Sequence, residues 1–272
     1  AAFTSTTSVC VTGLVVVDTF SYWSLFGKGV ILILIQIGGL GIVSIITLFM
    51  LLLRMKITLK STMLLQDAFN LNSKQGLLKF TIKVIKGTFL IEGIGALIYS
   101  FYYCREYGFL KGIWFSVFHA VSAFCNAGID IMGADSLISY HSNLLMMLNT
   151  SFLIIMGGIG FIVWWDTVEA FRRIRTKRCS IRSAWNGVHL QTKIAIFMTL
   201  LLLIGGTIVI YFLERSNPDT LGNLSEKDRI LNAFFQSVTF RTAGFAAVSQ
   251  VALRPVTAFF GVLLMMIGGS PV

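Results

Sequence analysis

Charged residues are scarce in this chain of 272 residues. Only 12% of the residues are Asp, Glu, Lys or Arg, whereas 56% are hydrophobic and the mean hydropathy is +0.81. A soluble core of this size cannot bury so much apolar surface, which excludes an ordinary water-soluble fold. Apolar runs long enough to cross a bilayer occur at roughly 30–53, 77–103, 143–165 and 191–213, and a fifth begins near 256. The sequence therefore predicts an all-α polytopic membrane protein.

Cysteine pairs and metal-ligand clusters are also lacking. The four cysteines form no C-x-x-C pair and have no histidine at metal-ligand spacing. We expect them to pack as small apolar side chains: Cys10, Cys104, Cys125 and Cys179. At membrane depth only Glu92 and His119 are available as acid, base or ligand, and His119 is expected to be packed. This argues against a membrane-embedded enzyme, so we expect no catalytic residue. No initiating methionine or cleavable signal is visible.

Basic residues, which give a net charge of +10, are concentrated in two segments. Seven basic residues and one acid lie between Arg54 and Lys86, and seven basic residues and two acids lie between Asp166 and Lys193. The positive-inside rule places both segments in the cytoplasm and the intervening loops outside. No basic face with interleaved aromatic residues accompanies them, so we expect no nucleic-acid partner.

Three similar segments, each containing a glycine, recur along the chain. They read Cys10-Val11-Thr12-Gly13-Leu14, Cys125-Asn126-Ala127-Gly128-Ile129 and Arg241-Thr242-Ala243-Gly244-Phe245. The glycines are almost evenly spaced, since 128 − 13 = 115 and 244 − 128 = 116. A glycine pair within a long apolar run follows each segment: Gly38-Gly39, Gly157-Gly158 and Gly268-Gly269. Self-similarity at a fixed period indicates a repeated structural unit.

Each glycine segment follows a short amphipathic stretch, at about 111–125 in the second repeat and about 228–241 in the third. Such a stretch is too short to cross a bilayer, so it is expected to enter the membrane and return. Non-helical backbone at membrane depth is tolerated only where protein buries it or water lines it. Helix C-termini directed at the midplane favour a cation, and rings of backbone carbonyls replace the hydration shell in potassium filters. The segments are therefore predicted to line an ion pathway.

The predicted ion ligands are backbone carbonyl groups in the three segments. They belong to Val11, Thr12, Gly13, Asn126, Ala127, Gly128, Thr242, Ala243 and Gly244. Glycine suits a place where the chain needs unusual dihedrals and an ion approaches the backbone closely. A single glycine of this kind usually marks helix packing, but three in register favour a filter. The glycine pairs fit close helix packing as well as a flexing or gating role.

Four charged residues are candidates for a role beside the filter or as its support. Asp18 and Asp130 lie just beyond their glycines, where they would either concentrate cations at an outer mouth or cap turns. Arg241 immediately precedes the third segment, and a second cation inside a cation filter is unfavourable. Its side chain is therefore expected to turn away and bind an acid or carbonyls behind the filter. Glu92 is a functional candidate as an intramembrane acid, and a structural pairing with an arginine is the preferred interpretation.

The glycine segments with their flanks, residues 4–19, 122–128 and 241–245, closely resemble the Trk/Ktr/HKT potassium transporter superfamily, most of all its bacterial Ktr-type membrane subunit. The resemblance covers essentially the whole chain. It implies four M1–P–M2 units around one pore, potassium conduction across a bacterial cell membrane and a homodimer of membrane subunits. It also implies a cytoplasmic ring of nucleotide-binding RCK subunits that regulates opening. No cofactor is expected in this chain; K⁺ is the transported ion, Na⁺ is a candidate activator, and nucleotide would act only through the partner.

The same resemblance divides the chain into repeats. A partial first repeat occupies 1–54, the second 77–166 and a truncated third 190–272, with cytoplasmic loops at 55–76 and 167–189. The first outer helix and the fourth repeat are expected to be missing from the chain.

The expected mechanism is passive, selective entry of K⁺ driven by the membrane potential. Within the family, glycine rather than serine at the first filter position is the potassium-type signature, which Gly13 satisfies; a sodium-coupled or sodium-permeable relative is the alternative. The expected gate is Gly268-Gly269-Ser270-Pro271, because proline removes a backbone donor and breaks a helix. No proline follows the earlier glycine pairs, so only the third repeat is expected to break. The resemblance implies an intramembrane loop there that blocks the ion path.

Overall fold

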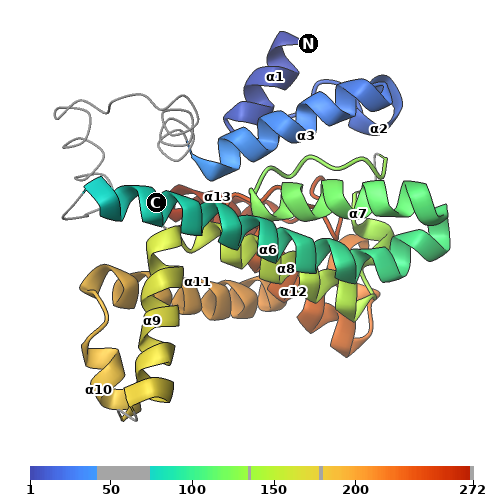
Figure 1. Ribbon diagram of the computed structural model, residues 1–272. Coiled ribbons are helices and arrows are strands. Elements are labelled where there is room, and N and C mark those ends of the chain that lie inside the picture. Colours follow the sequence, from blue (N-terminus) through green and yellow to red (C-terminus); the bar gives the residue numbers. More distant parts are fainter. Residues whose placement is uncertain (42–73, 134–135, 178–179, 270–272) are drawn as a thin grey trace. The chain divides into compact units, whose positions relative to one another are not determined.

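The computed structural model describes residues 1–41, 74–133, 136–177 and 180–269 (Figure 1). These residues form helices joined by loops, and this part of the chain contains no strand. The prediction of an all-α membrane protein is confirmed. The helices divide into two compact units, Ala1–Ala134 and Asp135–Val272.

The first unit is built around a helical hairpin. In the hairpin, α6 and α7 lie side by side (Figure 1) and are joined by Gly108, whose φ of +81° allows the sharp reversal. Helix α1 packs on α3, and α3 packs on α7. The bounds are α1 Ala2–Val9, α2 Thr19–Tyr22, α3 Leu25–Leu40, α6 Lys74–Tyr107 and α7 Phe109–Phe124.

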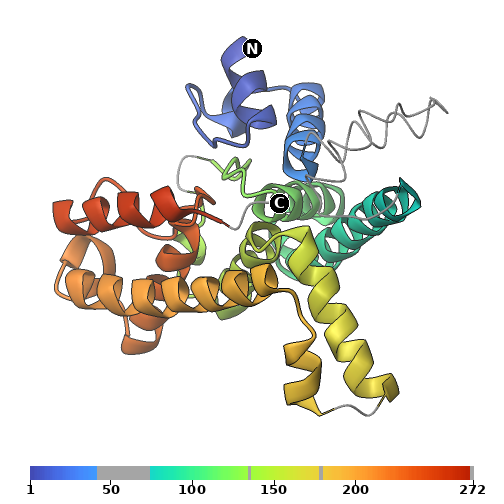
Figure 2. The same cartoon turned by 90° about the vertical axis from the view of Figure 1, so that its left-hand side faces the viewer.

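The second unit is centred on a long apolar helix, α11, which packs against α12 and α13 (Figure 2). Buried side chains from these helices, among them Leu202, Ile210, Phe240 and Leu264, form its core. The bounds are η1 Ile138–Tyr140, α8 Leu144–Gly158, α9 Phe161–Lys177, α10 Ile181–Asn186, α11 Leu190–Glu214, η2 Pro218–Gly222, α12 Glu226–Thr239 and α13 Pro255–Ile267.

Two helices of the described chain are long and apolar enough to cross a membrane, over Thr81–Tyr107 and Leu190–Glu214. They match the runs predicted at 77–103 and 191–213. Large apolar side chains on α11, such as Ile204 at 60% exposure, point away from the protein interior. Such a surface suits hydrocarbon, in which a helix satisfies its own backbone hydrogen bonds.

The continuous span predicted at 143–165 is wrong. Helices α8 and α9 are bent by 100° over a break at Ile159 and Gly160. Gly160 has a φ of +93°, a conformation that ends a right-handed helix and that glycine adopts readily. In the first repeat, α3 likewise ends at Leu40, before Gly41 with a φ of +78°. The rest of the run predicted at 30–53, and most of the loop at 55–76, lie outside the described residues.

A buried carboxylate closes the end of α11. Glu214, which is fully buried, accepts hydrogen bonds from Asn217 Nδ2 (2.7 Å), Thr220 Oγ1 (2.6 Å), Thr257 Oγ1 (2.5 Å) and the backbone N–H of Arg254 (2.9 Å). These donors come from the loop after α11 and from the start of α13. One side chain therefore ties both ends of this connection together.

Candidate functional site

Each glycine segment begins where a short helix ends. Helices α1, α7 and α12 end at Val9, Phe124 and Thr239, four or five residues before the glycines. The start of α12 is set by Ser225, whose Oγ accepts the N–H of Asp228 as an N-cap. The short helices lie at the predicted stretches, and the glycines follow their C-terminal ends as expected.

A hydroxyl group in the last helical turn holds the glycine segment in two repeats. Ser122 Oγ donates to the carbonyl of Ile129 at 2.5 Å, and Thr239 Oγ1 donates to the carbonyl of Phe245 at 2.7 Å. In both cases the acceptor directly follows the glycine of the segment. These bonds fold the segment back along its helix, a role that the sequence reasoning missed. A Ser or Thr five or six residues before the glycine is the signal that it overlooked.

The three segments share an unusual backbone conformation. The glycines have φ values of +73°, +61° and +83°, and the residue two positions before each also has positive φ: Val11 at +54°, Asn126 at +56° and Thr242 at +72°. Positive φ is unfavourable for β-branched residues, so Val11 and Thr242 are strained. Such strain persists only where the surrounding structure imposes it, and it clusters at functional and ligand-binding sites. In the described chain, Ser136 is the one other non-glycine residue with positive φ.

The segments of the first and second repeats touch each other within the first unit. A Cβ atom added at Gly13 would lie 2.6 Å from the carbonyl oxygen of Ala127. Side chains do not tolerate such a distance to a backbone atom, so glycine is required at Gly13 for steric as well as dihedral reasons. Two predicted ligand groups are thus brought together, Gly13 and the Ala127 carbonyl. The third segment belongs to the second unit.

The first glycine pair packs directly behind these segments. A Cβ atom at Gly38 would lie 2.2 Å from the carbonyl oxygen of Val9 and 2.7 Å from Cγ2 of Val11, and one at Gly39 would lie 2.2 Å from Sγ of Cys125. The pair therefore lets α3 approach the segments of both repeats. This contact requires close packing, which is one of the two interpretations of the glycine pair.

The preferred pairing of Glu92 with an arginine is wrong for the described residues. Its Oε1 accepts a hydrogen bond from Gln36 Nε2 at 3.0 Å, and Cys125 Sγ lies 3.9 Å away. Gln36 precedes the carboxyl by 56 residues in the chain, so no local pattern indicates this pair. His119 is buried against the rings of Tyr99 and Tyr103, in agreement with its expected packing role.

Arg241 turns towards the candidate gate. Its Nε donates to the carbonyl of Gly268 at 3.4 Å and its Nη2 donates to Thr199 Oγ1 at 3.2 Å. The expected carbonyl partner is therefore present. Gly268 ends α13 with a φ of +65°, and a Cβ atom at Gly269 would lie 2.9 Å from the carbonyl oxygen of Gly158. Ser270 and Pro271, the other predicted gate residues, lie outside the described residues.

The expectation that only the third repeat breaks is wrong. Helix α8 ends at Gly158, and the chain bends by 100° between α8 and α9 although no proline is present there. The sequence reasoning missed the second glycine signal, since Gly41 and Gly160 each follow a glycine pair by two residues and both have positive φ. In both repeats the helix ends one or two residues before this third glycine.

The two acids placed at the outer mouth make local contacts. Asp18 is the N-cap of α2 and accepts hydrogen bonds from the backbone N–H groups of Phe20 and Ser21. A further hydrogen bond from the Ser21 hydroxyl lowers the pKa of Asp18, so this carboxylate is ionised at neutral pH. Asp130 accepts the N–H of Met132 at 3.3 Å. Both residues cap turns, and a role in concentrating cations stays a prediction.

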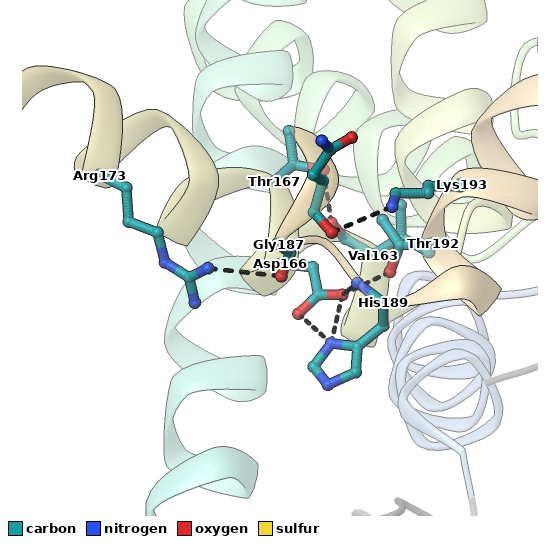
Figure 3. A network of polar contacts seen from close by, with 9 residues as sticks. Val163, Asp166, Thr167, Arg173, Gly187, His189, Thr192 and Lys193 are labelled. Atoms are coloured by element: carbon teal, nitrogen blue, oxygen red, sulfur yellow. Dashed lines mark hydrogen bonds and ion pairs between the residues drawn. The ribbon is translucent and has the colours of Figure 1, made fainter. Parts of the chain in front are cut away.

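A polar network fixes α9, the helix that follows the bend (Figure 3). The sequence did not predict this network. The carboxylate of Asp166 on α9 accepts hydrogen bonds from Thr192 Oγ1 at 2.7 Å and from the backbone N–H of His189 at 3.3 Å, and His189 Nδ1 lies 2.8 Å away. His189 is the N-cap of α11, so the carboxylate lies at a helix N-terminus, where negative charge is favourable. The network anchors α9 to the start of α11.

Comparison with known proteins gives the family. The model of the TrkH family, described as cation transport proteins, matches residues 1–272. The potassium/sodium uptake protein NtpJ of Enterococcus hirae and the Ktr system potassium uptake protein B of Bacillus subtilis are each 40% identical to the chain over 270 residues. The Ktr system potassium uptake protein B of Vibrio alginolyticus is 33% identical over 270 residues.

These alignments cover 99% of the chain and 57% or 58% of each relative, so the chain spans a little over half the length of the curated relatives it matches. Both the extent of the family match and the identity to these relatives lead to the same assignment: the chain belongs to the TrkH family of cation transport proteins.

Proposed function

We propose that the chain carries three of the filter segments of a potassium uptake protein. The observation that supports this proposal best is the shared backbone conformation, with positive φ at Gly13, Gly128 and Gly244 and at the residue two positions before each. A backbone strained in the same way in three repeats is expected where carbonyl groups coordinate an ion. The repeats would occupy 1–54, 77–166 and 190–272.

The membrane potential would drive the entry of potassium. The carbonyl groups of the three segments and of a fourth would coordinate the ion. The relatives from Bacillus subtilis and Vibrio alginolyticus are named as potassium uptake proteins. One glycine per repeat, in place of the longer signature of potassium channels, implies fewer ion sites and looser selection against Na⁺. K⁺ is the cargo, and we assign no resident cofactor to this chain.

Sodium transport is the second candidate function. The relative from Enterococcus hirae is named as a potassium/sodium uptake protein, and Na⁺ would act either as a second cargo or as an activator. Glycine at the first filter position, Gly13, favours potassium. Enzymatic catalysis is not proposed, since the relatives are named as transport proteins.

The proposed gate lies where α13 ends. Gly268 is hydrogen-bonded to Arg241, which precedes the third segment, and Gly269 approaches the backbone of Gly158 where α8 ends. A movement of Gly268-Gly269 would therefore reach both the third segment and the α8 break. Deleting the loop that begins at Gly268 is expected to raise the maximal potassium flux and to weaken control by a partner. An unchanged flux with intact control would place the gate elsewhere.

The proposed assembly is a homodimer in a bacterial cell membrane, with a cytoplasmic RCK-type ring that binds the regulatory nucleotide. Two relatives are named as proteins of a Ktr system, and this name supports the presence of further subunits. The basic segments 54–76 and 172–189 would form the docking surface for this ring. Cysteines introduced at Lys60 and Arg175 should resist an impermeant thiol reagent added from outside. Efficient labelling from outside would invert the topology and rule out this docking surface.

Potassium uptake in cells that lack other potassium systems tests the proposal. The full-length protein should restore growth at low external K⁺, and Gly128→Ser should weaken the preference for K⁺ over Na⁺, because its positive φ disfavours a residue with a side chain. Gly205→Ala is the control, since a Cβ atom there has no neighbour within 4 Å. Growth that does not depend on the protein, or an equal effect of both substitutions on the K⁺ to Na⁺ uptake ratio, would refute the proposal.

A further inference from the structure

Glu92 is buried where three elements of the first unit meet. It belongs to α6, inside the candidate span Thr81–Tyr107, and only 4% of the residue is exposed. One carboxyl oxygen, Oε1, faces both Gln36 Nε2 of α3 at 3.0 Å and Sγ of Cys125, the C-cap of α7, at 3.9 Å. This single oxygen therefore joins α3 to the glycine segment of the second repeat.

The other carboxyl oxygen, Oε2, has no hydrogen-bond partner among the described residues. Thr88, one helical turn earlier on α6, is also fully buried with an unpartnered hydroxyl there. No ion pair to Glu92 occurs within the described chain. An ionised carboxylate in such a place would lose its hydration without compensation. A carboxylic acid that keeps its proton avoids this cost, and Oε1 can still accept both hydrogen bonds.

The backbone of α3 near this acid packs closely against the glycine segments. Cβ atoms added at Gly38 and Gly39 would lie against Val11 and Cys125, so α3 touches the glycine segments of both repeats. Those segments meet where Gly13 approaches the Ala127 carbonyl. A displacement of α3 relative to Cys125 would therefore change the distance between two predicted ion-binding segments.

We propose that Glu92 is a positioning residue that acts as a neutral carboxylic acid. By accepting hydrogen bonds from Gln36 and Cys125 it holds α3 against the second segment, and it thereby sets the spacing between the segments of the first and second repeats. This inference rests on the proposed filter function and adds a residue that contacts no ion.

The test compares three substitutions at Glu92 in the full-length protein, reconstituted in liposomes and scored by the ratio of K⁺ to Na⁺ flux. Glu92→Gln keeps an acceptor and a donor without charge, and should leave the ratio within about twofold of its original value. Glu92→Leu removes both hydrogen bonds and should lower the ratio several-fold. Glu92→Asp shortens the side chain and should lower the ratio as well. Gly93→Ala, whose Cβ would have no neighbour within 4 Å, is the matched control on α6.

Coupling to Gln36 separates positioning from general stability. Gln36→Leu should lower the ratio as Glu92→Leu does, and the double substitution should cause little further loss, because both remove the same bond. Loss of selection in Glu92→Gln with normal selection in Glu92→Asp would show that a negative charge is needed and would overturn the proposal. This comparison decides the question even if Glu92→Leu fails to accumulate in the membrane.

Failure of the inference and failure of the proposed function give different results. If Gly128→Ser lowers the flux ratio but neither Glu92→Leu nor Gln36→Leu does, the filter stands and the positioning role is refuted. If Gly128→Ser and Gly244→Ser both leave the ratio unchanged, the filter assignment itself fails.

Discussion

Replacing Gly13 with alanine should disturb ion selection through one defined contact. The added Cβ atom would lie 2.6 Å from the Ala127 carbonyl oxygen, whereas ordinary contacts begin at 3.4 Å. The oxygen must therefore move by roughly 3.4 − 2.6 = 0.8 Å, a shift that interiors packed as tightly as crystals accommodate poorly. Alanine at a φ of +73° also costs about 1–2 kcal/mol. Displacement of a predicted ion ligand by this amount should weaken discrimination between K⁺ and Na⁺.

Gly108→Ala provides the matched control for this substitution. Gly108 has a φ of +81°, close to that of Gly13, but a Cβ atom there has no neighbour within 4 Å. Both variants should lose similar backbone stability, so their amounts in the membrane are compared first. The K⁺ to Na⁺ uptake ratio, measured in cells without other potassium systems and normalised to protein, should change only in Gly13→Ala. An unchanged ratio in Gly13→Ala, or the same change in both variants, would refute the steric argument.

Three further predictions concern one packed glycine and two carboxylates. Gly38→Ala, whose Cβ would lie 2.2 Å from the Val9 carbonyl oxygen, should abolish uptake or accumulation, whereas Gly29→Ala on the same helix, with no neighbour within 4 Å, should not. Asp166→Ala should lower the free energy of unfolding by about 0.5–2 kcal/mol, because it removes the acceptor at the start of α11; unaltered thermal unfolding in detergent would contradict this. Glu214→Ala should lower the free energy of unfolding by about 1–3 kcal/mol or more, because buried donors lose their acceptor. Glu226→Ala is the control, because its side chain is 65% exposed, and it should lower the free energy of unfolding by no more than about 1 kcal/mol. Equal melting temperatures of the Glu214→Ala and Glu226→Ala variants would exclude a stabilising role for the Glu214 network.

The long apolar helices were predictable because their signal is local. Helix α11 begins and ends within one residue of the predicted run at 191–213, and α7 and α12 lie at the predicted short stretches. The bend between α8 and α9 was not predicted, because residues 143–165 read as one apolar run and the break depends on the positive φ of Gly160. The hydropathy of a segment carries no information about that backbone dihedral angle.

The detailed geometry of the site depends on contacts between distant parts of the chain. Glu92 was predicted to pair with an arginine, and its partner Gln36 is a neutral residue 56 positions away. The positive φ values of Val11 and Thr242 run against the intrinsic preference of β-branched residues. Only tertiary structure imposes such a conformation, so no reading of local propensity could have found it. The glycines themselves were found because their spacing repeats.

Ion selection by reconstituted protein tests the central claim most directly. Reversal potentials across liposomes with K⁺ on one side and Na⁺ on the other should show a preference for K⁺ in the unsubstituted full-length protein. Gly244→Ser, at a φ of +83°, should reduce that preference, as should Gly128→Ser. The account would be contradicted if the unsubstituted protein showed no preference for K⁺, or if both substitutions left the reversal potential unchanged.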